Sequence, residues 1–168
     1  MNIIKALIII LALGFGSCKE ESIINTTHAI PDFGWAYKDS LQYNFEIKDT
    51  STAYNLYLDI KHTAAYPLQN LYTYVRTVYP NGKTYQQQLN MDLASKSGAW
   101  NGEKAWFSDE YNLRIVLQEG SFFNQIGNYK LNLQQYLRQD SIPGLSQITL
   151  CIEDAHRKRG DGKKKTKK

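Results

Sequence analysis

The chain contains 168 residues, of which 42% are hydrophobic and 21% are charged, and its formal net charge is +4. This length predicts one domain whose hydrophobic core is large enough to be stable without cross-links or metals. Two cysteines exclude a disulfide-rich scaffold. The charge is unevenly distributed, because residues 157–168 carry +7 whereas residues 18–156 carry −4. We expect the basic tail to be disordered, since its like charges cannot form a core. The acidic body argues against nucleic-acid binding.

Residues 1–17 have the pattern of a bacterial lipoprotein signal peptide. Lys5 closes a short basic segment, and the ten apolar residues from Ala6 to Phe15 are too few to span a bilayer. The small residues Gly16 and Ser17 precede Cys18, as in a lipobox. Cleavage there makes Cys18 the first mature residue, whose thiol accepts a diacylglycerol. The alternative is an ordinary secretory signal with an incidental cysteine.

Acylation of Cys18 predicts a soluble domain attached to a membrane, because two or more acyl chains suffice for stable anchoring. We expect residues 18–31 to form a tether that ends at Pro31. Lys19-Glu20-Glu21 resembles the surface-export signals of some outer-membrane lipoproteins, although a polar spacer explains these residues equally well. The predicted location is the cell envelope, at the outer rather than the inner membrane, with the domain facing the periplasm or the exterior.

Alternating apolar and polar residues predict β-strands through the rest of the chain. The segments are 41–47, 54–60, 71–79, 84–89, 111–117, 129–133 and 148–152. Turn residues 49–52 predict a hairpin between the first two strands, and Pro80-Asn81-Gly82-Lys83 predicts another between the next two. Residues 134–139 are the one place where a short helix is expected.

These patterns predict an all-β domain over residues 32–156. Seven or eight strands with frequent turns indicate an antiparallel β-sandwich, jelly-roll-like or immunoglobulin-like. We expect Cys151 to pack in the core, because it lies in a strand with no neighbouring basic group to activate its thiol.

The sequence contains no recognisable catalytic motif, so we predict that the protein is not an enzyme. The three histidines are scattered and lack partners at metal-ligand spacing, so neither a metal nor a cofactor is expected. A hydrolase whose carboxylates converge only in the fold remains an alternative.

Three tyrosines are candidates for a contact surface. Tyr57, Tyr72 and Tyr74 lie opposite the inward residues of their predicted strands. Aromatic side chains in such positions favour contacts with proteins or carbohydrates. The alternative is that both faces of the sandwich are partly covered and simply bury these rings.

The order and spacing of several short patterns resemble the gliding-motility lipoprotein family GldH. They are Cys18, residues 54–63, Tyr66-Pro67, Asn70-Leu71-Tyr72, Pro80-Asn81-Gly82, residues 98–102 and residues 150–153. The resemblance implies an envelope lipoprotein that acts with other gliding lipoproteins, in bacteria whose motility apparatus is linked to type IX protein secretion. A surface glycan-binding lipoprotein is the alternative from another class. The oligomeric state stays open.

Overall fold

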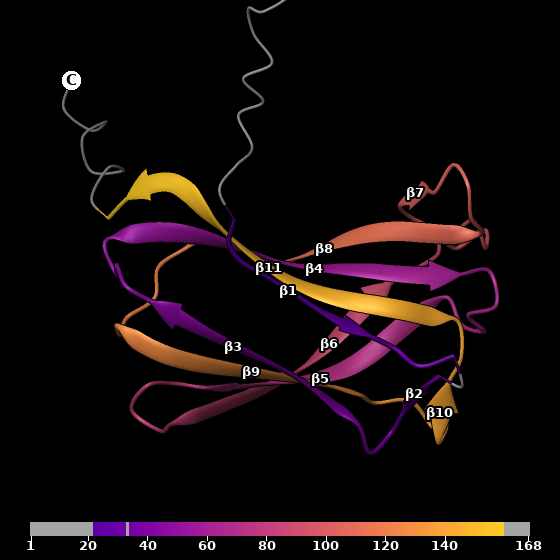
Figure 1. Ribbon diagram of the computed structural model, residues 1–168, viewed down its shortest axis with the longest axis horizontal. Helices are drawn as coiled ribbons and strands as arrows, with labels where there is room; N and C mark the ends of the chain where they lie inside the picture. Colours follow the sequence, from indigo (N-terminus) through magenta and orange to yellow (C-terminus); the bar gives the residue numbers. More distant parts are fainter. Residues whose placement is uncertain (1–21, 33, 160–168) are drawn as a thin grey trace, which may run out of the picture.

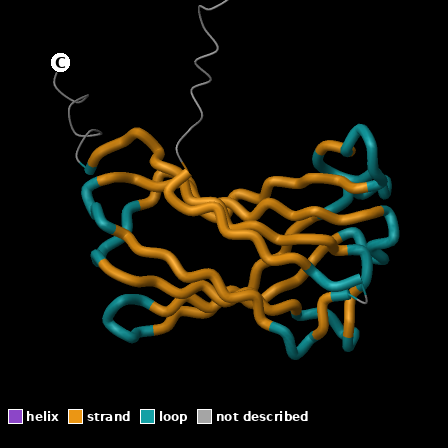
Figure 2. The backbone as a smooth tube through the Cα atoms, viewed as in Figure 1, coloured by secondary structure: helices purple, strands orange, loops and turns teal. Residues whose placement is uncertain are grey.

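The computed structural model describes residues 22–32 and 34–159, which form two antiparallel β-sheets packed face to face (Figure 1). Figure 2 shows that the described backbone consists of strands and loops, so the expected all-β sandwich is confirmed. No helix occurs among these residues, and none of them forms a helical membrane span.

The upper sheet in Figure 1 has five strands, in the order β1-β11-β4-β8-β7. Its strands are β1 (Ser22–Ala29), β4 (Thr52–Thr63), β7 (Glu103–Lys104), β8 (Glu110–Ser121) and β11 (Leu145–Lys158).

The lower sheet has four strands, in the order β3-β9-β5-β6. Its strands are β3 (Ser40–Ile47), β5 (Asn70–Val78), β6 (Thr84–Asp92) and β9 (Gly127–Gln135). A small third pairing joins β2 (Trp35–Ala36) and β10 (Ser141–Ile142) at one end of the sandwich.

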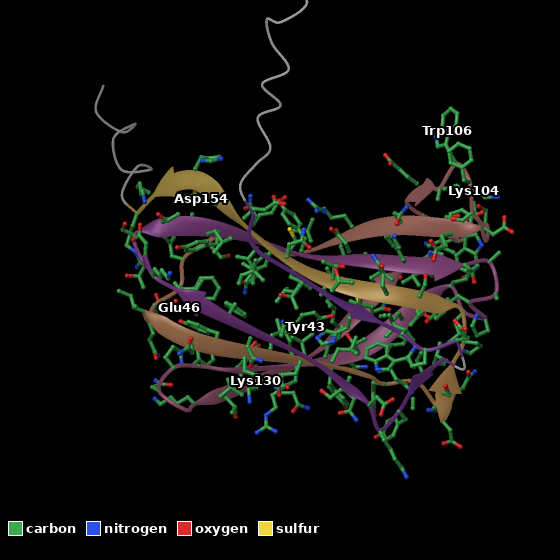
Figure 3. The ribbon with its side chains drawn as sticks, viewed as in Figure 1. Tyr43, Glu46, Lys104, Trp106, Lys130 and Asp154 are labelled. Carbon is green, nitrogen blue, oxygen red and sulfur yellow. The ribbon has the colours of Figure 1, made fainter. Side chains whose placement is uncertain are left out.

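The core lies between the two sheets and is built by the alternation seen in the sequence. Each strand turns every second side chain inward, and the inward residues of β3 and β4 are buried. Tyr43 of β3 is fully buried between the sheets, where Figure 3 labels it. Its hydroxyl donates a 3.0 Å hydrogen bond to the carbonyl oxygen of Ile148 on β11, which ties the two sheets together.

The hairpin expected between residues 41–47 and 54–60 is wrong. β3 pairs with β9, whereas β4 pairs with β11 and β8 in the other sheet. The Asp49 carboxylate accepts hydrogen bonds from Ser51 and Thr52, and this turn carries the chain from one sheet to the other. The second predicted hairpin is correct, since β5 and β6 pair across the turn in which Gly82 has a φ of +78°.

The expected tether overlaps a strand, because residues 22–29 form β1 along β11. Thr27 and Thr149 join the two strands by a hydroxyl hydrogen bond of 2.7 Å. The strand that pairs with β1 lies more than a hundred residues away in the chain. The polar residues of the segment, taken alone, therefore suggested a linker. At the other end β11 continues to Lys158, so residues 157 and 158 of the expected tail belong to a strand. Residues 1–21 and 160–168 lie outside the described residues.

The structure has eleven strands in its described part, against the seven or eight expected. The additional ones are β1 and three strands of two residues each, β2, β7 and β10. The short helix expected at residues 134–139 is absent. β9 runs to Gln135, whose amide bonds to Leu137 and Gln139 and holds a turn instead.

Candidate functional site

The three candidate tyrosines do not form one surface. Tyr57 lies on β4, on the outer face of the five-stranded sheet, whereas Tyr72 and Tyr74 lie on β5, on the outer face of the other sheet. All three point away from the core as expected, and each is half-buried by neighbours on its own face. The molecule therefore presents two separate candidate faces.

The first face is organised by the guanidinium of Arg114 on β8. It makes two hydrogen bonds of 2.7 Å to the Asp59 carboxylate and a longer one of 3.3 Å to Glu153. The same guanidinium lies 4.7 Å from the centroid of the Tyr57 ring, a cation–π contact. The Tyr57 ring thus packs against an ion-pair network of Arg114, Asp59 and Glu153, which we call the Arg114 network.

Two carboxylates from distant strands converge in this network. Local sequence offers no signal for the pair, because the register places Arg114 of β8 opposite Asp59 of β4, and only its guanidinium reaches on to Glu153 of β11. Both contact the same guanidinium, and the hydrogen bond to Asp59 is the main cause that raises the pKa of Arg114. Such an arrangement is typical of a structural ion pair.

Cys151 is buried, as the sequence predicted, but it lies on the outer face of its sheet beside this network, so the expectation that no basic group is near its thiol is wrong. Burial is the main cause that raises the pKa of its thiol to about 11, and its hydrogen bond to Glu153 contributes further. The thiolate is the reactive form, so this environment makes the thiol inert near neutral pH.

The second face is rich in amides and tyrosines. Strand register places three tyrosines and six amide side chains in adjacent rows around Arg76, and Glu46, Lys130 and Asp92 lie at the margins of the same outer face. We call the central surface the amide–tyrosine face. Its members are Ser40, Gln42, Tyr72, Tyr74, Arg76, Gln86, Gln88, Asn90, Asn132, Gln134 and Tyr136. Tyr74 and Tyr136 are in contact, with ring centroids 4.3 Å apart. Amide groups both donate and accept hydrogen bonds, so this face suits an uncharged polar ligand.

A cavity of about 600 Å³ opens between the two sheets beside β6 and β8. Its walls combine the apolar Leu117 and Leu131, the aromatic Phe45 and Tyr129, and several amides such as Gln87. Its volume is within the range of small-molecule sites.

The most exposed aromatic residues of the described structure are not among the three predicted contact tyrosines. Trp106 and Phe107 are 94% and 99% exposed, on the loop between β7 and β8. The pair of adjacent aromatic residues among polar ones was the available signal, but it lay in a segment without strand periodicity. Among the described residues, no group of three His, Cys, Asp or Glu side chains is placed to hold a metal ion.

The sequence of the described domain matches a protein-family model along most of its length. The family model for the GldH lipoprotein matches residues 22–152, from the start of β1 nearly to the end of the domain. The chain belongs to the GldH lipoprotein family. Membership implies anchoring to a membrane of the cell envelope through a lipid, although Cys18 itself lies outside the described residues.

Two relatives of this chain are named after the family. A gliding motility lipoprotein GldH homolog of Christiangramia forsetii is 27% identical over 137 residues, which cover 80% of this chain and 81% of the relative. The gliding motility lipoprotein GldH of Flavobacterium johnsoniae is 24% identical over 146 residues, covering 86% and 88%. Among solved structures, a carbohydrate-binding module specific for non-crystalline cellulose matches with a TM-score of 0.42 and 8% identity, covering 77% of this chain and 72% of the module.

Proposed function

We propose that this GldH-family protein is a non-enzymatic lipoprotein required for bacterial gliding, acting as a component or assembly factor of the machinery linked to type IX secretion. The supporting observation is the family match across residues 22–152, together with relatives named for gliding motility. Its partners in this proposal are other gliding lipoproteins and the membrane that holds the acyl chains of Cys18.

The place where the described domain begins sets how far it can lie from that membrane. β1 starts at Ser22, only four residues after Cys18. Four extended residues span at most about 14 Å. An acylated Cys18 therefore keeps the five-stranded sheet, to which β1 belongs, close to the bilayer surface. We place this bilayer at the outer membrane, with the domain on its periplasmic or exterior side.

The exposed edge of β6 supports a role in binding other proteins. β6 is the last strand of its sheet, and most of its residues are exposed. A strand edge offers free backbone donors and acceptors to a strand from another chain. This edge lies in the sheet that does not contain β1, so the short tether leaves it accessible.

Gene deletion and complementation test the proposed function. A deletion strain should lose spreading on agar, and the wild-type gene should restore it. Cys18→Ala should yield a folded protein that leaves the membrane fraction and fails to restore spreading, because tethering is lost. Ile126→Ala, which removes an exposed side chain outside β6, is the matched control and should restore it. Normal spreading of the deletion strain would contradict the proposal.

The amide–tyrosine face favours a second candidate function, the binding of a neutral surface glycan. Its amide groups complement a chain of hydroxyl groups, and Tyr74 with Tyr136 offers an aromatic platform. Native gel electrophoresis in gels that contain amylose, laminarin or hydroxyethylcellulose should then retard the protein. Tyr74→Ala should abolish the retardation, whereas Tyr57→Ala on the opposite face should not. Unaltered mobility in all three gels would exclude this candidate for the glucans tested.

A further inference from the structure

Trp106 and Phe107 are the least covered large apolar side chains in the described structure. Single exposed apolar residues are normal on protein surfaces, but two adjacent aromatic side chains that are almost fully exposed indicate contact with another apolar phase. Figure 3 shows Trp106 on a loop that stands out beyond one end of the five-stranded sheet.

The base of this loop is closed by specific contacts. The backbone N–H of Ala105 donates to the carbonyl oxygen of Glu110 at 2.8 Å, and the Lys104 ammonium lies 3.3 Å from the Asp109 carboxylate. Lys104 also lies over the Tyr111 ring, 6.0 Å from its centroid. These contacts hold the two ends of the loop together, so its tip carries the aromatic side chains outward.

We propose that this loop inserts Trp106 and Phe107 into the headgroup region of the bilayer that anchors Cys18. Tryptophan favours the membrane–water interface, because its ring is apolar and its N–H can still find a polar partner there. This inference rests on the proposed acylation of Cys18 and adds a second contact site to it.

The loop and the beginning of β1 lie on the same side of the sandwich. In Figure 1 both are on the upper side, and the four-stranded sheet is on the lower one. β1 and β7 are the two edges of one sheet, which places them about 19 Å apart across four strand spacings. The register from Ser22 to Lys104 at the loop base adds seven residues, about 23 Å, along the strands. A single bilayer against this side can therefore receive both the anchor and the loop.

The surroundings of the two rings favour a lipid surface over a protein partner. Aromatic anchors of protein interfaces generally lie at the centre of a well-packed patch. Here the next residues, Ser108 and Asp109, are polar and exposed. A narrow tip of this kind can insert into the headgroup region of a bilayer, because fluid lipids do not require a pocket of matching shape.

Tryptophan fluorescence of the acylated mature protein, residues 18–168, tests the proposal. The protein is reconstituted into vesicles of phosphatidylethanolamine and phosphatidylglycerol, with and without brominated acyl chains. The signal of Trp106 is the difference between the wild type and Trp106→Ser, since the other two tryptophans, Trp35 and Trp100, are buried and half-buried. We expect brominated lipid to quench this signal, and iodide to quench it several-fold less than it quenches indole in solution. Tyr85→Ser is the control and should leave the signal unchanged.

Flotation of the same vesicles separates failure of the anchor from failure of the loop. Protein that does not float lacks the acyl anchor, which contradicts both the proposed function and this inference. Protein that floats while Trp106 stays open to iodide overturns the loop insertion alone. If Trp106 is open in lipid vesicles but shielded in native envelopes, its partner is a protein, and the proposal is wrong.

Discussion

The Arg114 network provides a stringent test of how the five-stranded sheet is stabilised. Arg114→Met keeps an unbranched apolar chain over the Tyr57 ring but removes the guanidinium. The Asp59 carboxylate is 37% exposed, so its loss of a partner is screened by water and should cost less than about 1 kcal/mol. Glu153 is only 10% exposed in its side chain, so leaving it without the guanidinium should cost more, about 2 kcal/mol.

We therefore expect Arg114→Met to lower the free energy of unfolding of residues 19–168 by about 2–3 kcal/mol in urea denaturation. Glu153→Gln in the same chain should recover much of this loss, because a neutral amide tolerates burial better than an unpaired carboxylate. A double-mutant cycle measures the coupling between the two residues. Arg76→Met on the amide–tyrosine face is the matched control and should change stability by less than about 0.5 kcal/mol. Coupling close to zero would refute the reasoning.

Three further predictions follow from buried or constrained residues. Burial lowers the pKa of His62, so its contribution to stability is complete above about pH 6.5 and is lost as the pH falls further. Thermal melting should show a fall in Tm between pH 7 and pH 5, and His62→Phe should reduce that fall. Cys151 should resist alkylation by iodoacetamide in the native protein, as judged by mass spectrometry, and react only after unfolding. Gly102→Ala should cost more than Gly98→Ala in urea denaturation, although both glycines have a φ of +86°, because a Cβ on Gly102 alone would overlap the Asn112 carbonyl oxygen.

The His62 prediction depends on a cluster that joins distant segments. The ring of His62 lies against Trp100 and Tyr111, with centroids 4.8 and 5.5 Å away. Its Nε2 has no hydrogen-bond partner among the described residues, so a proton added there finds no acceptor in that part of the chain. A Tm that stays constant between pH 7 and pH 5 would contradict this account.

Local patterns predicted the strands with clear alternation, and they failed where pairing is long-range. β4 was recognised because every second residue is apolar, and that alternation alone decides which face is buried. β1 was missed because its partner β11 comes at the other end of the chain. Similarly, a turn such as Asp49–Thr52 is compatible with a hairpin or with a crossing between sheets, and local chemistry does not distinguish the two.

The sequence by itself determined the class of the fold, the outward orientation of Tyr57, Tyr72 and Tyr74, and the resemblance to the GldH family. These depend on alternation, turn residues and the order of short patterns, all of which are local properties of the chain. Only the tertiary structure decided which outward residues share a face. Strand order separated Tyr57 from the other two tyrosines, brought Asp59 and Glu153 to Arg114, and left Trp106 exposed at the tip of a loop. The physical reason is that strand order and register are fixed by the packing of the whole core. No single segment contains enough information to predict them.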